Sequence, residues 1–312
     1  MNRGIVVVLG ALVSAAAAAA LAGQARAPLI VASIASDGEL VPIARYDGTS
    51  WRNTWPEPIE DGAPLPVRTV SEIPRAWLGQ PVPLTWTAWS QTGKQQEVTV
   101  TGVDREGACV QAITLATSSK PDAPADGLAF NRPTKVDAIV ALEQSSPQWE
   151  VLRREVVPHF RTAVTTPALP QPGREQHEIG AKVLALGRAD TSAAETVVVS
   201  EVFRDRRFPV FFIGAHRVFG GIPSDTDYDA LSYEGWFRRD RAGALTPVIA
   251  SVDPFSTAEG KLPRYTPIGI LRLGMGSIWA MSEWGKESQT IVLFDISGKG
   301  VRKLTSADIS GC

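Results

Sequence analysis

Short apolar runs separated by turn residues recur along most of the chain, and this pattern constrains the fold more than any other feature. Residues 29–34 and 40–46 are two such runs, and Asp37-Gly38 between them favours the positive φ angles of a tight hairpin turn. Apolar runs joined by short connections are typical of antiparallel sheets. The sequence therefore predicts a mainly β protein, α+β by content, whose antiparallel sheets form a sandwich-like body.

Further strands are predicted on both sides of the chain's centre. Residues 82–117 contain β-branched runs and two glycine turns, which predicts at least three strands. Residues 51–68 contain four prolines and are predicted to form an extended loop. The strands predicted in the second half are residues 180–189, 195–204, 207–219, 232–240, 244–253, 269–273, 277–285, 289–297 and 301–304.

A propeller-like arrangement is the alternative architecture, because one turn motif occurs twice. The motif Gly-x-Leu-x-Pro begins at Gly38 and again at Gly243. A propeller repeats its hairpins about every 40–50 residues. Two distant copies do not supply that period, so antiparallel sheets in a sandwich-like body remain the main prediction.

One stretch predicts the principal helix. Ser146 can cap its N-terminus, and Pro147 suits the first helical position. Pro158 lies inside the pattern and is expected to kink or end the helix near Val157. The apolar face is formed by residues three or four positions apart, which are Trp149, Leu152, Val156 and Phe160.

Residues 1–27 have the three-part composition of a secretory signal peptide. Arg3 supplies positive charge, and residues 5–23 form an apolar or small-residue run. Residues 25–27 offer a small-x-small cleavage site that Pro28 disfavours, and residues 20–22 and 23–25 are the alternatives. We therefore expect a cleaved signal peptide and a secreted or periplasmic protein. The alternative is a membrane anchor formed by residues 5–23, because this run is long enough to span a bilayer. Membrane contact is expected only if the segment stays uncleaved.

The rest of the chain is expected to comprise two regions. Residues 28–117 form an N-terminal β region, residues 118–135 a polar connecting loop with prolines, and residues 136–312 an α+β region. The α+β region is expected to pack with the N-terminal region as one body.

The balance of charge argues against nucleic acid as a partner. The chain has 31 Lys and Arg residues against 33 Asp and Glu residues, which gives a formal net charge of −2. Nucleic-acid-binding domains usually present a clustered excess of basic side chains. A protein or a glycan is therefore the expected partner.

The sequence contains no familiar catalytic or cofactor-binding motif. The zinc pattern H-E-x-x-H, the hydrolase pattern G-x-S-x-G and the phosphate-binding glycine loop are all missing. No cofactor is therefore predicted. These observations favour a non-catalytic binding or envelope-associated protein. The alternative is a secreted hydrolase whose catalytic carboxylates the sequence does not identify.

An acidic stretch is the best candidate for a metal site. Asp225, Asp227 and Asp229 alternate like the first ligands of a calcium-binding loop, and Glu234 follows them. The glycine and the final glutamate of that motif are not in their usual places. A calcium loop and a solvated acidic loop therefore both remain open.

Tryptophans and arginines supply two further candidate sites. Trp51, Trp55 and Trp89 are candidates for stacking on a ligand, with packing in the core as the alternative. Arg204, Arg238 and Arg239 are candidates for binding an anion. The alternative for the arginines is a set of cross-strand charge pairs.

Only two cysteines are present, Cys109 and Cys312. In an oxidising compartment the simplest expectation is a disulfide between them. Such a bond would join the C-terminal residue to the N-terminal β region. A buried free Cys109 and an intermolecular bond through Cys312 are the alternatives.

Overall fold

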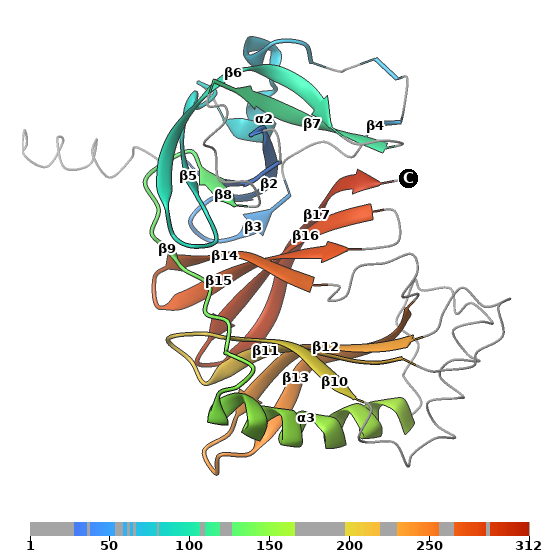
Figure 1. Ribbon diagram of the computed structural model, residues 1–312. Coiled ribbons are helices and arrows are strands. Elements are labelled where there is room, and N and C mark those ends of the chain that lie inside the picture. The colour runs from blue at the N-terminus through green and yellow to red at the C-terminus, as the bar shows by residue number, and fades with distance from the viewer. Residues whose placement is uncertain are drawn as a thin grey trace, which may run out of the picture.

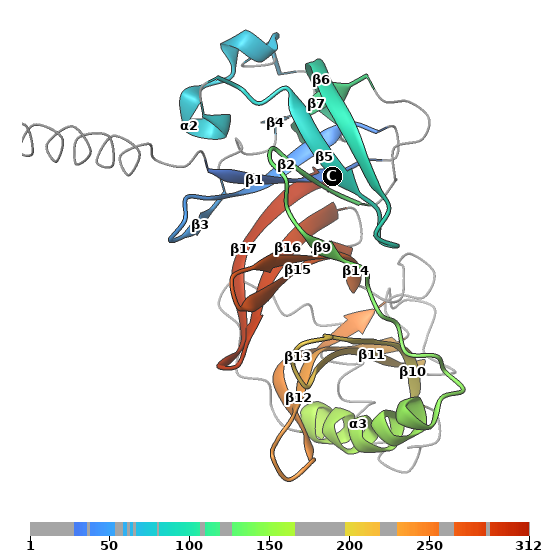
Figure 2. The same ribbon diagram turned by 90° about the vertical axis from the view of Figure 1, so that its left-hand side faces the viewer.

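The computed structural model describes residues 28–35, 38–53, 59–60, 63–64, 67–79, 81–106, 110–118, 127–165, 197–218, 230–255, 265–284 and 288–311. These residues form stacked layers: a six-stranded barrel, the sheet of β14–β17, the sheet of β10–β13, and the helix α3 (Figures 1 and 2). The prediction of a mainly β protein with antiparallel sheets and one principal helix is confirmed.

The first layer is a barrel built from both sides of the predicted connecting loop. Its strands are β1 (Leu29–Ile34), β2 (Leu40–Tyr46), β5 (Thr85–Trp89), β6 (Gln95–Glu106), β7 (Val110–Thr117) and β8 (Leu128–Phe130). Pairing of Leu40 with Leu115 closes it between β2 and β7. Strand β8 lies within residues 118–135 and pairs with both β1 and β5, so this part of the segment belongs to the barrel.

Short elements cover the barrel and fill its interior. They are β3 (Trp51–Arg52), β4 (Ile59–Glu60), the 3₁₀ helix η1 (Val70–Glu72) and α2 (Arg75–Leu78). The two short strands lie in the segment predicted as an extended loop. Trp86 from β5 is buried inside the barrel together with Ile73 and Leu78. These apolar side chains fill the interior, as side chains do in small barrels.

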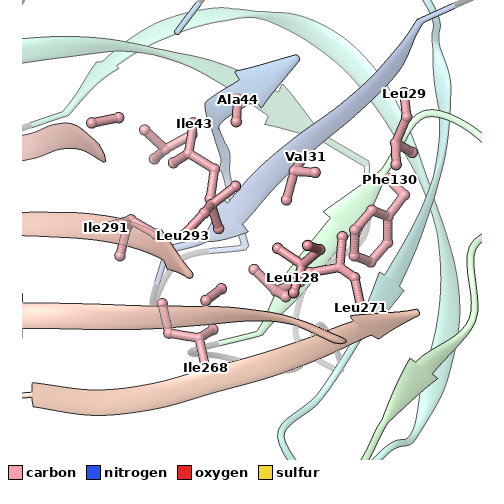
Figure 3. Close-up of a cluster of buried hydrophobic side chains, with 14 of the residues drawn as sticks. Leu29, Val31, Ile43, Ala44, Leu128, Phe130, Ile268, Leu271, Ile291 and Leu293 are labelled. Carbon is pink, nitrogen blue, oxygen red and sulfur yellow. The ribbon is translucent and has the colours of Figure 1, made fainter. Parts of the chain in front are cut away.

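The second layer is buried on both faces. It comprises β14 (Tyr265–Leu273), β15 (Gly276–Trp284), β16 (Ser288–Ser297) and β17 (Gly300–Gly311), with β9 (Val136–Asp137) at the β14 edge. One face packs on the outside of the barrel, where Leu271 and Leu293 meet Val31 and Leu128 (Figure 3). Strand β17 also pairs with β7, so the barrel and this layer belong to one continuous 13-stranded sheet.

The other face of this layer packs against a separate four-stranded sheet. Its strands, in spatial order, are β10 (Val198–Arg204), β11 (Val210–Val218), β12 (Ala230–Arg239) and β13 (Leu245–Phe255). Aromatic rings fill the space between the layers. The ring of Trp236 lies 5.2 Å from that of Phe212, 5.1 Å from that of Trp279 and 5.6 Å from that of Phe294, measured between centroids.

The helix α3 (Pro147–Thr165) covers the outer face of the four-stranded sheet (Figure 2). The predicted cap is confirmed, because the Trp149 backbone N–H donates to Ser146 Oγ at 3.2 Å. Pro158 was expected to kink or end the helix near Val157, but the helix does not end there and continues to Thr165. Proline inside a helix costs about 3 kcal/mol, but Phe160 and Val164 beyond it are each only 3% exposed. Burying two such side chains offsets that cost.

Residues 1–27 and the predicted strand at 180–189 lie outside the described residues. Among the residues that are described, no helix is long and apolar enough to cross a membrane.

Candidate functional site

A cavity of about 400 Å³ lies on the outside of the barrel, between the β2–β3 hairpin and α2. We call it the hairpin cavity. It is lined by Arg45, Asp47, Arg52, Asn53, Ala76 and Trp77. Two guanidinium groups, one carboxylate, one amide and one indole therefore meet in a single shallow space.

The turn between β2 and β3 fixes the acidic side of the hairpin cavity. Asp47 Oδ1 accepts the backbone N–H groups of Ser50 and Thr49, both at 2.9 Å, and the Thr49 hydroxyl at 2.7 Å. These bonds, the Ser50 backbone N–H foremost, hold the pKa of Asp47 well below its usual range. Asp47 therefore stays ionised at neutral pH.

The two arginines differ in how tightly the fold holds them. Arg45 Nη1 donates to the Ala76 carbonyl oxygen at 3.1 Å, which ties β2 to α2. Arg52 Nε lies 3.7 Å from Asp47 Oδ2, and 71% of the Arg52 side chain is exposed. Since Asp47 also serves the turn, Arg52 keeps most of its donors directed at solvent and open to a ligand.

The tryptophan candidates are distributed around the barrel. Trp51 stacks on Tyr46 with ring centroids 5.1 Å apart and precedes the cavity residue Arg52. Trp89 is half-buried on β5 and packs against the core between the barrel and β14–β17. Trp55 lies outside the described residues. Sequence reasoning missed Trp77, because no periodic pattern marks the one-turn helix that carries it.

The three arginine candidates do not converge on one anion. Arg204 lines a second cavity, of about 490 Å³, together with Arg206 and Gln148 of α3. Arg239 pairs with Glu155 of α3 through two hydrogen bonds, at 3.1 and 2.7 Å. Arg238 Nη2 instead donates to the Gly298 carbonyl at 3.4 Å, in the β16–β17 turn. Arg238 and Arg239 therefore join their sheet to different layers.

The carboxylate in the second cavity has a structural role. Asp205 is buried and accepts the Trp279 indole N–H at 2.7 Å. Its other oxygen accepts the backbone N–H groups of Arg207 at 2.7 Å and Phe208 at 3.0 Å. These bonds satisfy the carboxylate and lock the β10–β11 turn onto β15.

Of the proposed calcium ligands, only Glu234 is described, and it is 5% exposed. Its Oε1 accepts the Ser232 hydroxyl at 2.7 Å, and its Oε2 accepts the Tyr265 backbone N–H at 2.9 Å. Asp225, Asp227 and Asp229 lie outside the described residues. Within the described part of the chain, no group of three His, Cys, Asp or Glu side chains could hold a metal ion. The calcium loop stays a prediction.

Glu234 has an acidic neighbour that sequence reasoning did not identify. Glu201 on β10 and Glu234 on β12 both pair with Gly214 on β11, and burial followed by the charge of Glu234 raises the pKa of Glu201 to about 7. The folded chain thus retains this proton to higher pH than the unfolded chain. The contribution of Glu201 to stability is therefore greatest below its ordinary pKa of 4.5 and declines as the pH rises towards 7.

Cys109 and Cys312 also lie outside the described residues, but their chain neighbours are described. Val110 pairs with Gly311, and Gln111 pairs with Ser310, in the antiparallel ladder between β7 and β17.

Comparison with protein-family models, with curated proteins and with solved structures finds no match for this chain.

Proposed function

We propose that this chain is a non-catalytic binding protein, secreted or periplasmic, that recognises a carboxylate-bearing saccharide at the hairpin cavity. The observation that carries the proposal is the meeting of Arg45, Arg52 and Trp77 in one open cavity. The signal-like composition of residues 1–27 supports the proposed location.

The chemistry of the lining matches an acidic sugar. A guanidinium group binds a carboxylate through two parallel hydrogen bonds, which gives both charge and orientation. The indole of Trp77 offers an apolar face for sugar C–H groups, and Asn53 adds a polar amide to the same lining. Two cationic side chains against one anionic side chain favour an anionic ligand over a neutral one.

Arg52→Gln is expected to weaken binding of trigalacturonate at least tenfold, because a hydrogen bond to a charged group contributes about 1.5–3 kcal/mol. Isothermal titration of the full chain measures the effect, and the exposure of Arg52 should leave the melting temperature unchanged. Arg153→Gln is the matched control, because Arg153 also forms an exposed ion pair, with Glu150 at 3.2 Å. Absence of binding by the unsubstituted chain, or equal binding by the Arg52→Gln variant, would contradict the proposal.

A secreted hydrolase is the second candidate, and the Glu201–Glu234 pair is the observation that favours it. A hydrolase that works with a carboxyl pair, as most glycoside hydrolases do, needs two carboxyl groups whose environments separate their pKa values. Burial and the charge of Glu234 raise the pKa of Glu201, as a general acid requires. Neither residue lines the hairpin cavity or the second cavity, so binding at the hairpin cavity remains the leading proposal.

A further inference from the structure

One row of mainly polar residues crosses each of the two packed sheets, β10–β13 and β14–β17, on the face that carries the aromatic core between them. One row crosses the first sheet and comprises Glu201, Gly214, Glu234 and Ser251. The opposing row crosses the second sheet and comprises Tyr265, Glu283, Thr290 and Asp308. Both rows adjoin the aromatic core around Trp236 and Trp279. Along the strands, the residues between the sheets therefore change from aromatic side chains to acidic ones.

Glu234 joins the two sheets at this point. Its side chain starts from β12, and its Oε2 accepts the backbone N–H of Tyr265, the first residue of β14, at 2.9 Å. The Phe212 and Tyr265 rings, with centroids 5.9 Å apart, make a second contact between the same two sheets. The ionised form of Glu234 strengthens the hydrogen bond to Tyr265, since charge-assisted bonds are the stronger ones.

Glu201 stands across Gly214 from this bond. Neighbouring strands are about 4.8 Å apart, so the backbones of Glu201 and Glu234 are separated by roughly 10 Å. Gly214 places no side chain between them, which lets the two carboxyl groups extend towards each other. Glu201 Oε2 is buried and has no hydrogen-bond partner within the described part of the chain.

We propose that Glu201 and Glu234 form a pH-sensitive clamp between the two sheets. When Glu201 carries a proton, Glu234 is the only charged member of the pair and holds the Tyr265 amide. When Glu201 loses its proton, the two like charges repel across Gly214, and the bond from Glu234 to Tyr265 opens more often. Burial, together with the charge of Glu234, raises the pKa of Glu201 to about 7, which sets the transition near neutral pH.

Other titratable groups face the same space. His216 is diagonal to Glu201 on β11, Asp253 lies on β13, Glu283 on β15 and Asp308 on β17. Burial lowers the pKa of His216 below its ordinary value of 6.5, so His216 gains its charge only in more acidic solution. Its protonation therefore opposes folding as the pH falls, whereas deprotonation of Glu201 opposes it as the pH rises.

Hydrogen exchange at the Tyr265 amide tests the clamp directly. In the full chain, the protection factor, corrected for the intrinsic exchange rate, is expected to fall about fivefold between pH 6 and pH 8. Glu201→Gln keeps the shape of the side chain and removes the ionisation, so this variant should show no such fall. Glu97→Gln, on an exposed position of β6, is the matched control and should behave like the unsubstituted chain.

A second variant separates the titration of Glu201 from that of His216, the group diagonal to it on β11. His216→Gln should retain the fall in protection above pH 7, because Glu201 is unchanged. The proposal is overturned if the unsubstituted chain shows no fall, or if the fall persists in Glu201→Gln; its disappearance in His216→Gln would assign the titration to His216 instead.

Discussion

Loss of a Cys109–Cys312 disulfide is expected to lower the free energy of unfolding by roughly 3–5 kcal/mol. The expectation rests on the ladder between β7 and β17, whose last described pair is Val110 and Gly311. Each of these residues is the direct chain neighbour of a cysteine, and the same register continued by one residue would pair the cysteines. Residues directly opposite in an antiparallel pair have Cα atoms about 4.5–5.5 Å apart, within the range that a disulfide spans.

The large effect follows from the length of chain that the bond would close. The ring would contain roughly 200 residues, and the entropy that a crosslink removes from the unfolded chain grows with ring size. Urea unfolding of the unsubstituted chain, purified under oxidising conditions, and of the Cys109→Ser/Cys312→Ser double variant measures the difference. Reductant should lower the free energy of unfolding of the unsubstituted chain and leave that of the double variant unchanged.

Peptide mapping without reductant checks the bond itself. A linked pair of peptides containing Cys109 and Cys312 is the expected product. Two free thiols, or a dimer joined through Cys312, would rule out the intramolecular bond.

Trp236→Ala is expected to destabilise the protein by about 3–5 kcal/mol. Trp236 is 1% exposed and contacts Phe212 of its own sheet together with Trp279 and Phe294 of the facing sheet. Removing the indole leaves a cavity in the middle of the interface that joins these two layers. Thermal or urea unfolding gives the size of the loss.

Trp51→Ala provides the comparison for that variant. Trp51 is half-buried and stacks on Tyr46 beside the hairpin cavity, so its loss should cost only about 1–2 kcal/mol. If the two variants lose the same free energy of unfolding, the interface around Trp236 contributes less to stability than its burial implies.

The sequence predicted those strands that are long enough to show an apolar run bounded by turn residues. Residues 29–34 and 40–46 coincide with β1 and β2, because each run is long, apolar and bounded by a turn. The three residues of β8 are too few to show a pattern. The closure of the barrel was also not predictable, because Leu40 and Leu115 are far apart in the chain and meet only in the folded protein.

The candidate site was likewise predictable from the sequence only in part. Trp51 was selected from the sequence because it stands in a polar, proline-rich stretch, whereas its neighbour Arg52, which lines the hairpin cavity, was not. The hairpin cavity could not, because it combines Arg45 of one segment with Trp77 of another. Glu201 was missed for a different reason: its raised pKa arises from burial and from Glu234 on a neighbouring strand, and neither is visible in the local sequence.

The most direct test of the binding proposal is the ¹H–¹⁵N spectrum of the tryptophan indoles during titration with trigalacturonate, assigned with single Trp→Phe variants. The chain contains nine tryptophans, so the spectrum reports on the hairpin cavity, the barrel and the aromatic core at once. Binding at the hairpin cavity predicts a progressive shift of the Trp77 signal. The signals of Trp236, two residues from Glu234 on β12, and of its neighbour Trp279 should stay in place. Shifts confined to Trp236 and Trp279, or no shift of Trp77, would contradict the account.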